Sequence, residues 1–191
     1  MKTIGVLALQ GDFEAHAAAL ARAGARASEV RTVEQLGGVE GLVIPGGEST
    51  TMLKLMSYYG LFEPLREFAA RRPVFGTCAG AILLASDVLN PRQASLEVLD
   101  MTIERNAYGR QLDSHVARLR DHALEGHDEL EAVFIRAPII RRVGDGGHVL
   151  ARHNGDPVLV DFGRHLVATF HPELTSDPRV HALFLSKVAA S

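Results

Sequence analysis

The sequence predicts an α/β fold in which helices cover both faces of a mixed, mostly parallel β-sheet. In the first half of the 191 residues, short apolar runs alternate with helical patterns, as in parallel sheets that are buried on both faces. The second half is richer in strand-like runs. Hydrophobic residues make up 47% of the chain, which is enough for a core of two or three layers.

The chain begins with two strand–helix alternations. Thr3–Leu9 is an apolar run and predicts the first strand. The Ala-rich stretch Phe13–Ala23 predicts a helix that Gly24 closes. A short strand is expected at Ala27–Arg31, and the apolar run Gly41–Ile44 predicts another.

A glycine turn, Pro45-Gly46-Gly47, follows the apolar run 41–44 and precedes the next helix. That helix is expected to start near Ser49, with Ser49 or Thr50 as its cap. Residues 61–71 predict one more helix before the apolar run Pro73-Val74-Phe75.

Most of the remaining elements are predicted to be strands. The candidates are Val98–Ile103, Val116–Leu119, Ala132–Ile135, His148–Arg152, Val158–Phe162 and His165–Thr169. Asp156-Pro157 and Gly163-Arg164 are expected to be hairpin connections, and a helix at about Arg179–Ala190 closes the chain. Because no repeat, low-complexity tract or linker interrupts the pattern, we expect one three-layer, flavodoxin-like domain over residues 1–191.

Cys78 is the single cysteine of the chain, and it lies in Gly76-Thr77-Cys78-Ala79-Gly80 directly after an apolar run. This is a G-x-C-x-G form of the nucleophile elbow, a sharp turn from a strand into a helix. Glycines suit such a turn because it leaves no room for flanking Cβ atoms. The helix expected at about Ala79–Ala85 points its N-terminus at the sulfur and favours the thiolate. The alternative, a buried cysteine acting as a small hydrophobe, is weakened by these glycines.

A histidine and a carboxylate follow late in the chain. Phe170-His171-Pro172-Glu173 comes after a strand-like run, and Pro172 biases His171 toward an extended backbone. Residues two apart in an extended chain project to the same side, so Glu173 could orient the His171 ring toward Cys78. Cysteine as nucleophile, histidine as base and a carboxylate behind it follow the logic of a catalytic triad.

The residues with chemical potential fall at the ends of predicted strands. Gln10, Gly46-Gly47, Cys78 and His171 each follow such a strand. In open α/β sheets, reactive groups gather at the carboxyl ends of the strands. We therefore expect these four positions to lie together.

The glycine turn has two readings besides a simple turn. A phosphate loop is disfavoured because G-x-x-x-x-G-K-[ST] is absent and Glu48 would repel phosphate. An oxyanion hole fits better, with one N–H donor from Ala79, the residue after the nucleophile, and the other from Gly47.

Two polar segments and a group of histidines have no clear role by themselves. Arg105–Gln111 and Phe134–Pro138 read as solvated loops. His115, His122, His127 and Asp128 lack zinc-type spacing, so we prefer a surface loop to a metal site there.

Taken together, these motifs resemble the class I, or triad, glutamine amidotransferases, and within them the glutaminase subunits of pyridoxal 5'-phosphate synthases. The matching blocks are residues 5–12, 45–51, 75–80, 104–111, 134–138 and 170–175. The elbow and His-Pro-Glu identify only the class. The segments around Arg105 and Ile135, with the Leu-Gln-Gly-Asp start, single out the vitamin B6 branch. One departure is His115, where the resemblance leads us to expect an aromatic residue such as Phe.

The resemblance implies hydrolysis of L-glutamine to glutamate and ammonia by Cys78, His171 and Glu173, without a cofactor or metal. The ammonia would pass to a synthase subunit, which we expect to dock near Gln10. The positions that match the family's glutamine-binding residues are Gly47, Glu48, Ser49, Arg105, Ile135 and Arg136. An arginine such as Arg105 suits the α-carboxylate of the substrate.

Composition narrows the alternatives. The net charge of −3 gives no reason to expect nucleic acid or an anionic membrane as a partner. One free thiol and no signal-peptide or membrane-spanning stretch favour a cytoplasmic protein. Three rivals stay open: a glutaminase serving another synthase, such as that of histidine biosynthesis, a non-catalytic regulatory module, and a different elbow-cysteine hydrolase.

Overall fold

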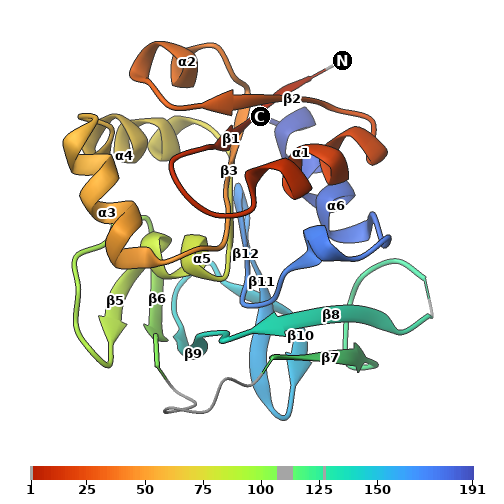
Figure 1. Ribbon diagram of the computed structural model, residues 1–191. Helices are drawn as coiled ribbons and strands as arrows, with labels where there is room; N and C mark the ends of the chain where they lie inside the picture. Colours follow the sequence, from red (N-terminus) through yellow and green to blue (C-terminus); the bar gives the residue numbers. More distant parts are fainter. Residues whose placement is uncertain (1, 107–113, 127) are drawn as a thin grey trace.

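The computed structural model describes residues 2–106, 114–126 and 128–191, and a seven-stranded sheet forms its centre (Figure 1). The strand order is β10-β11-β12-β4-β3-β1-β2. Five neighbouring strands, from β2 to β12, run parallel, whereas β11 and β10 are antiparallel additions. Their bounds are β1 Thr3–Leu7, β2 Arg26–Val30, β3 Gly41–Ile44, β4 Val74–Thr77, β10 His148–His153, β11 Asp156–Phe162 and β12 His165–Ala168. The expected mixed, mostly parallel sheet is confirmed.

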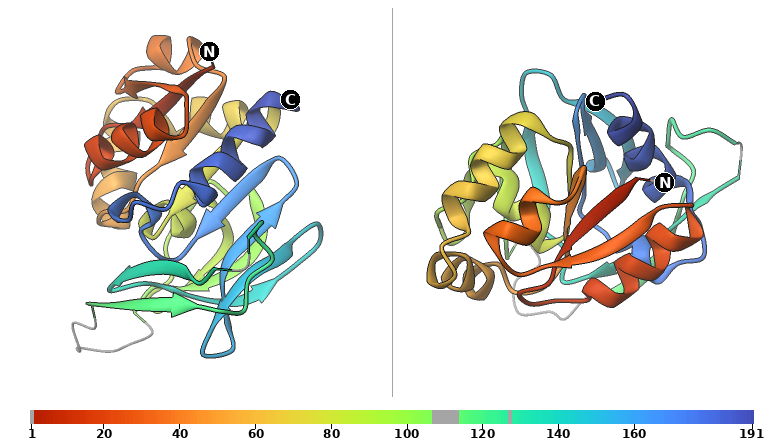
Figure 2. Two further views of the ribbon diagram at one scale, coloured as in Figure 1. Left: turned by 90° about the vertical axis from the view of Figure 1, so that its right-hand side faces the viewer. Right: turned by 90° about the horizontal axis from the view of Figure 1, so that it is seen from above.

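Helices cover both faces of this sheet, as Figure 2 shows from above. One face carries α1 (Phe13–Arg22) and α6 (Arg179–Ala189). The other face carries α2 (Val33–Gly37), α3 (Ser49–Tyr58), α4 (Phe62–Arg71) and α5 (Ala79–Leu84).

Alternation along the strands divides the core between the two faces. On β3, Leu42 and Ile44 pack under α3 and α4, whereas Val43 packs under α1 and α6. On β4, Val74 and Phe75 divide in the same way. All five are at most 1% exposed, so the central strands are apolar on both sides, as parallel sheets require.

Two smaller sheets lie below the parallel strands of the main sheet in the view of Figure 1. One is β5-β6-β9, formed by Ala85–Leu89, Leu99–Glu104 and Ile139–Val143. The other pairs β7 (Ser114–Leu119) with β8 (Leu130–Ile135). The sequence predicted the strand-rich second half but not α2, β5 or β9.

Two local predictions are wrong. The β10–β11 turn is at Asn154-Gly155 rather than at Asp156-Pro157, which begin β11. Both turn residues have positive φ, 51° and 88°, which Asn and Gly adopt most readily. The N-cap of α3 is Glu48, not Ser49 or Thr50: its carboxylate accepts hydrogen bonds from the Thr50 and Thr51 N–H groups. A carboxylate at this position satisfies two backbone donors at once and complements the helix dipole.

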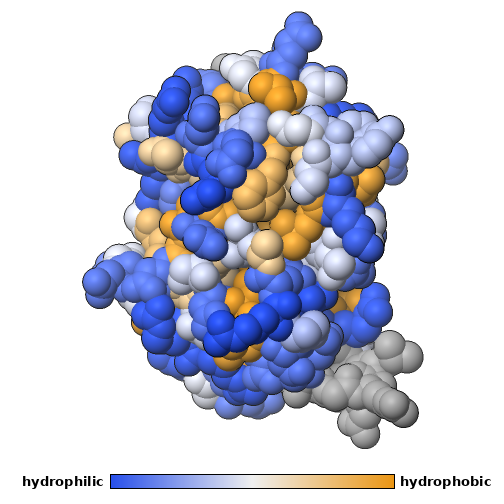
Figure 3. Space-filling model, turned by 90° about the vertical axis from the view of Figure 1, so that its left-hand side faces the viewer, coloured by the Kyte–Doolittle hydropathy of each residue, from blue (hydrophilic) through white to orange (hydrophobic). Residues whose placement is uncertain are grey.

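Polar and apolar side chains are interspersed on the face that carries α3 and α4 (Figure 3). Along α4 this follows from its sequence, because Leu65 and Ala69 are buried while Glu63 and Arg66 remain in solvent. Within the part of the chain that the structure describes, no helix is long and apolar enough to cross a membrane.

Candidate active site

Cys78 forms a strained turn between β4 and α5. Its backbone has φ 49° and ψ −106°, a conformation that a residue with a side chain rarely adopts. A Cβ added to Gly80 would lie 2.0 Å from the carbonyl oxygen of Ile44, and one added to Gly76 would lie 2.7 Å from the Gly80 backbone. Both glycines are therefore required by the close approach of backbone segments, which confirms the elbow.

His171 follows β12, which pairs with β4 and so brings the histidine to the same edge of the sheet as Cys78. A Cβ placed on Gly46 would lie 2.4 Å from His171 Cε1 and 3.3 Å from Cys78 Cβ, so the glycine turn leaves space for both side chains. His171 Nδ1 is 2.7 Å from Glu173 Oε1. Nε2 is left as the nitrogen available to the thiol.

Both neighbours of the His171 ring affect its protonation. Burial by itself disfavours the charged ring, but Cys78 and Glu173 favour it and raise the pKa of His171 to about 10. The imidazolium form therefore prevails at neutral pH. A proton is in place for a leaving group, and a cation lies beside the sulfur.

The glycine turn is held by Gln10. The Glu48 N–H donates to Gln10 Oε1 at 2.8 Å, and a Cβ on Gly47 would lie 2.4 Å from the same oxygen. Gly11, with φ 99°, approaches Gly46 so closely that its Cβ would lie 1.8 Å from the Gly46 oxygen. The predicted meeting of Gln10 with the Gly46-Gly47 turn is confirmed.

Glu48 lies between Arg105 and the start of α3. Burial raises the pKa of Glu48, but hydrogen bonds from Thr51 and Thr50 outweigh it and hold that pKa at about 2. Arg105 Nη2 is 3.4 Å from Glu48 Oε1 and 3.0 Å from Thr50 Oγ1. Its side chain is only 13% exposed, so the guanidinium is held in place at the rim of the site.

The Ile135 segment reaches the nucleophile through its backbone. Cys78 Sγ lies 3.9 Å from the carbonyl oxygen of Ile135, the last residue of β8. Arg136 has φ 45° and an exposed side chain, so the backbone turns sharply directly after that carbonyl. The structure thus places the Ile135 carbonyl beside Cys78, with Arg136 as the next residue along the chain, whereas residues 107–111 of the Arg105 segment lie outside the described residues.

Sequence reasoning missed two polar residues near the site. Gln93 Oε1 accepts a hydrogen bond from Ser49 Oγ at 3.2 Å, and no local pattern indicates this contact. His16 is fully buried on α1 and contacts Glu173. A signal for it exists in the sequence, because His16 shares the i, i+3, i+4 buried stripe of α1 with Ala19 and Leu20.

The histidines considered for a metal site are dispersed. His115 lies in β7 rather than in a surface loop, and its ring stacks on Phe134. Its Nε2 lies 3.3 Å from His153 Nε2. His122 contacts the Asp128 carbonyl, and His127 is outside the described residues. Among the residues that the structure describes, no cluster of three or more His, Cys, Asp or Glu residues could hold a metal ion.

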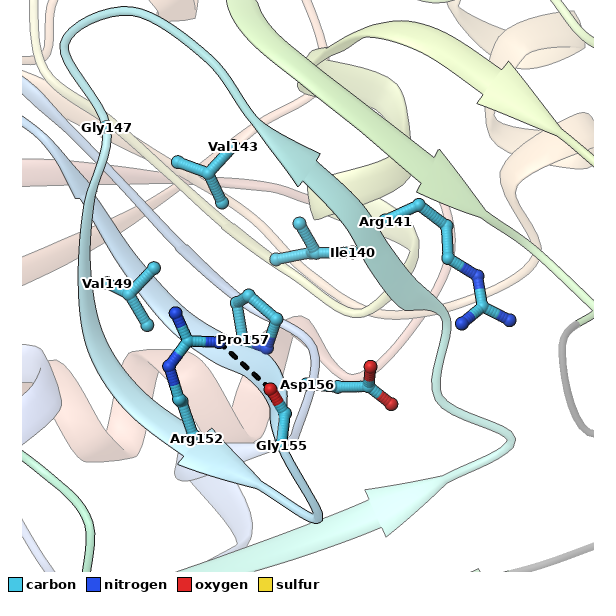
Figure 4. Close-up of a pocket in the computed structure, with 9 residues that line it drawn as sticks. All are labelled: Ile140, Arg141, Val143, Gly147, Val149, Arg152, Gly155, Asp156 and Pro157. Carbon is cyan, nitrogen blue, oxygen red and sulfur yellow. Dashed lines mark hydrogen bonds between the residues drawn. The ribbon is translucent and has the colours of Figure 1, made fainter.

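A surface hollow of about 530 Å³ lies elsewhere, between β9 and the β10–β11 hairpin (Figure 4). Arg152 closes part of it by donating to the Gly155 carbonyl at 2.9 Å. Its lining contains none of the predicted site residues. The reactive groups are instead gathered at the β4 and β12 strand ends.

Comparisons with known proteins agree with this geometry. The model of the SNO glutamine amidotransferase family matches residues 6–190. Relatives described as pyridoxal 5'-phosphate synthase subunit PdxT are 61% identical in Solibacter usitatus, covering 98% of this chain and 100% of the relative, and 52% identical in Thermus thermophilus, covering 95% of each. A crystal structure of a glutamine amidotransferase superposes with a TM-score of 0.89 at 49% identity, over 97% of this chain and 98% of the other. PurLQS from Thermotoga maritima, at 16% identity and a TM-score of 0.68, shares the fold.

Proposed function

This chain belongs to the SNO glutamine amidotransferase family, and we therefore propose that Cys78, His171 and Glu173 form its catalytic triad. The protein is the glutaminase subunit of a pyridoxal 5'-phosphate synthase: its family is one of glutamine amidotransferases, and relatives described as pyridoxal 5'-phosphate synthase subunit PdxT match it over nearly its whole length. The observation that carries the triad assignment is the Cys78 elbow beside a His171–Glu173 pair at 2.7 Å.

The first step is attack of the Cys78 sulfur on the carboxamide carbon of L-glutamine. As the S–C bond forms, the carbonyl oxygen takes up negative charge. We assign the Ala79 N–H, at the start of α5, and the Gly47 N–H as the donors that stabilise it. When the C–N bond breaks, the His171 imidazolium gives its proton to the nitrogen, which leaves as ammonia.

The second step is hydrolysis of the γ-glutamyl thioester that remains on Cys78. Neutral His171 takes a proton from water while the oxygen attacks the thioester carbon. The C–S bond then breaks, glutamate is released, and the imidazolium and thiolate are restored. Glu173 holds the ring through Nδ1 in both steps.

Arg105 supplies the charge for the α-carboxylate of glutamine in this proposal. In the structure its guanidinium contacts Glu48 and Thr50, which follow Gly47 closely in the sequence. The backbone around Ile135 and Arg136, together with Ser49, would close the remaining sides of the substrate. A bidentate arginine fixes the orientation of a carboxylate and so directs the carboxamide end toward Cys78.

A synthase subunit receives the ammonia, and we propose that its docking at Gln10 activates the site. Gln10 Oε1 accepts from the Glu48 N–H, which belongs to the Gly47–Glu48 peptide, so a partner that moves Gln10 would also act on the adjoining Gly46-Gly47 peptide. Loss of one oxyanion donor lowers kcat by about 10²–10³-fold. We expect a low kcat for the free chain and a higher kcat with saturating synthase subunit, whereas equal values would refute activation by the partner.

A glutamine-like electrophile tests the assignment of the nucleophile. It should label one site, Cys78, at a rate that rises when the synthase subunit is present. Glutamine should protect the thiol, and the acid-denatured chain should show no such protection. Labelling that glutamine does not slow would mean that the cysteine is outside the substrate site.

A further inference from the structure

A series of buried polar side chains continues from the triad into the interior of the protein. His16 on α1 is 0% exposed and places Nε2 3.0 Å from Thr77 Oγ1 and 3.3 Å from Glu173 Oε2. Its Nδ1 is 3.1 Å from His181 Nε2 on α6. Helices α1 and α6 lie side by side on one face of the sheet (Figures 1 and 2), and Thr77, at the end of β4, contacts His16 of α1.

The positions of the hydrogens on the His16 and His181 rings follow from the acceptors beside them. A carboxylate only accepts, so the His16 tautomer with its hydrogen on Nε2 is the one that suits the neighbouring Glu173. His16 Nδ1 then accepts from the Nε2–H of His181. Glu173 Oε2 is buried and has no hydrogen-bond partner among the described residues. It lies 3.3 Å from His16 Nε2, whose hydrogen bond is with Thr77 Oγ1.

The environment keeps His16 uncharged. Burial, then His181 and His171, lower the pKa of His16 well below its ordinary value. The groups that face it are Glu173 and His171 beyond β12, Thr77 on β4 and His181 on α6. A neutral His16 does not compete with the His171 imidazolium for the charge of Glu173.

We propose that His16 is a positioning residue for the glutaminase reaction, linking Thr77, beside the nucleophile, to Glu173, behind the base. The two halves of the triad follow two different strands, with Cys78 directly after β4 and the His171–Glu173 pair after β12. His16 contacts both halves from a third element, α1, and fixes the Glu173 carboxylate against His171 Nδ1. This inference rests on the proposed function, because it assigns a role within that triad.

The variant His16→Leu removes both contacts and keeps a side chain of moderate size. Without its second partner, Glu173 is less firmly held, and His171 loses part of the interaction that keeps it protonated. In the complex with the synthase subunit we expect kcat to fall about 10- to 100-fold with KM unchanged. The alkaline limb of the pH profile should move down by about one unit. The rate of Cys78 alkylation by iodoacetamide should show the same shift without substrate.

His165→Leu is the matched control. His165 is also a buried histidine that hydrogen-bonds strand β4, through Val74 N–H at 3.2 Å, but it contacts none of the triad. It should lower thermal stability and leave the alkaline limb in place. His16→Gln should approach wild-type behaviour because its amide can donate from about the position of Nε2, whereas His16→Asn should not.

The outcomes distinguish a failure of the role proposed for His16 from a failure of the proposed function. If wild-type protein releases ammonia but His16→Leu and His165→Leu have the same kcat and pH limb, the role of His16 is overturned. If His16→Leu does not fold, the contrast between Gln and Asn at position 16 decides, and equal profiles overturn the proposal. If wild-type protein with its partner releases no ammonia, the proposed function itself fails.

Discussion

Glu173 Oε1 lies 2.7 Å from His171 Nδ1, and both side chains are buried. A buried carboxylate at this distance orients the ring and stabilises its charged form. Burial alone would lower the pKa of His171, so its rise to about 10 depends on Cys78 and Glu173.

Removing the charge of Glu173 should therefore change the pH profile as well as the rate. In Glu173→Gln the size is kept but the anion is lost, so the alkaline limb of kcat/KM should move toward lower pH. We expect kcat to fall about 10²–10⁴-fold. The exposed control Glu63→Gln should leave both quantities unchanged. An unaltered alkaline limb in Glu173→Gln would contradict the role of Glu173.

The elbow should not tolerate a methyl group at Gly80. The Cβ of Gly80→Ala would meet the Ile44 carbonyl at 2.0 Å, and backbone atoms there cannot turn aside. We expect a loss of about 1–3 kcal/mol in the free energy of unfolding, measured by denaturant titration. Gly37→Ala, where nothing lies within 4 Å, is the control and should not destabilise. Equal stability of the two variants would argue against the tight elbow.

Arg105→Ala tests substrate capture. If Arg105 binds the α-carboxylate, its loss should cost roughly 2–4 kcal/mol of transition-state stabilisation, seen in kcat/KM for glutamine. Arg142→Ala is the control and should leave kcat/KM unchanged, because Arg142 pairs with Asp100 away from the site. Arg136→Ala should cost less than Arg105→Ala because the Arg136 side chain is exposed. An unchanged kcat/KM would remove Arg105 from the substrate site.

The fold should lose stability in mild acid. Burial, Arg164 and Lys187 lower the pKa of His165 from 6.5 to about 4. Between these pH values the unfolded chain binds a proton that the folded chain does not, so stability is full above pH 6.5 and falls as pH drops toward 4. The loss from this group is on the order of 3 kcal/mol.

His165→Asn tests this origin of acid lability. Asparagine keeps an acceptor for the Val74 N–H but cannot take up a proton. Its unfolding free energy should depend less steeply on pH between 6.5 and 4. Some dependence should remain because His181, whose pKa is lowered to about 4, behaves in the same way. Identical slopes for the variant and the wild type would contradict the assignment to His165.

Local patterns predicted the elements that surround the site. The elbow glycines, the apolar runs of β3 and β4 and the His-Pro-Glu segment all depend on steric or periodic constraints that neighbours in sequence impose. They indicated which strand ends meet. The PdxT relatives favour the vitamin B6 branch over a glutaminase of histidine biosynthesis, a choice that rested on the segments around Arg105 and Ile135.

What sequence reasoning missed depends on contacts between distant segments. Helix α2 has five residues and is anchored by one buried side chain, Leu36, so it has too little periodicity to be read. The capping of α3 by Glu48 and the Ser49–Gln93 contact require the folded loop. The link from His16 to Glu173 joins residues at opposite ends of the chain.

Ammonia release from glutamine, measured for wild type and Cys78→Ala with saturating synthase subunit, tests the central claim most directly. The account predicts equal amounts of ammonia and glutamate from the wild type. The Ala variant should fold and bind its partner but release no ammonia above the rate without enzyme. Substantial hydrolysis by Cys78→Ala would contradict the triad.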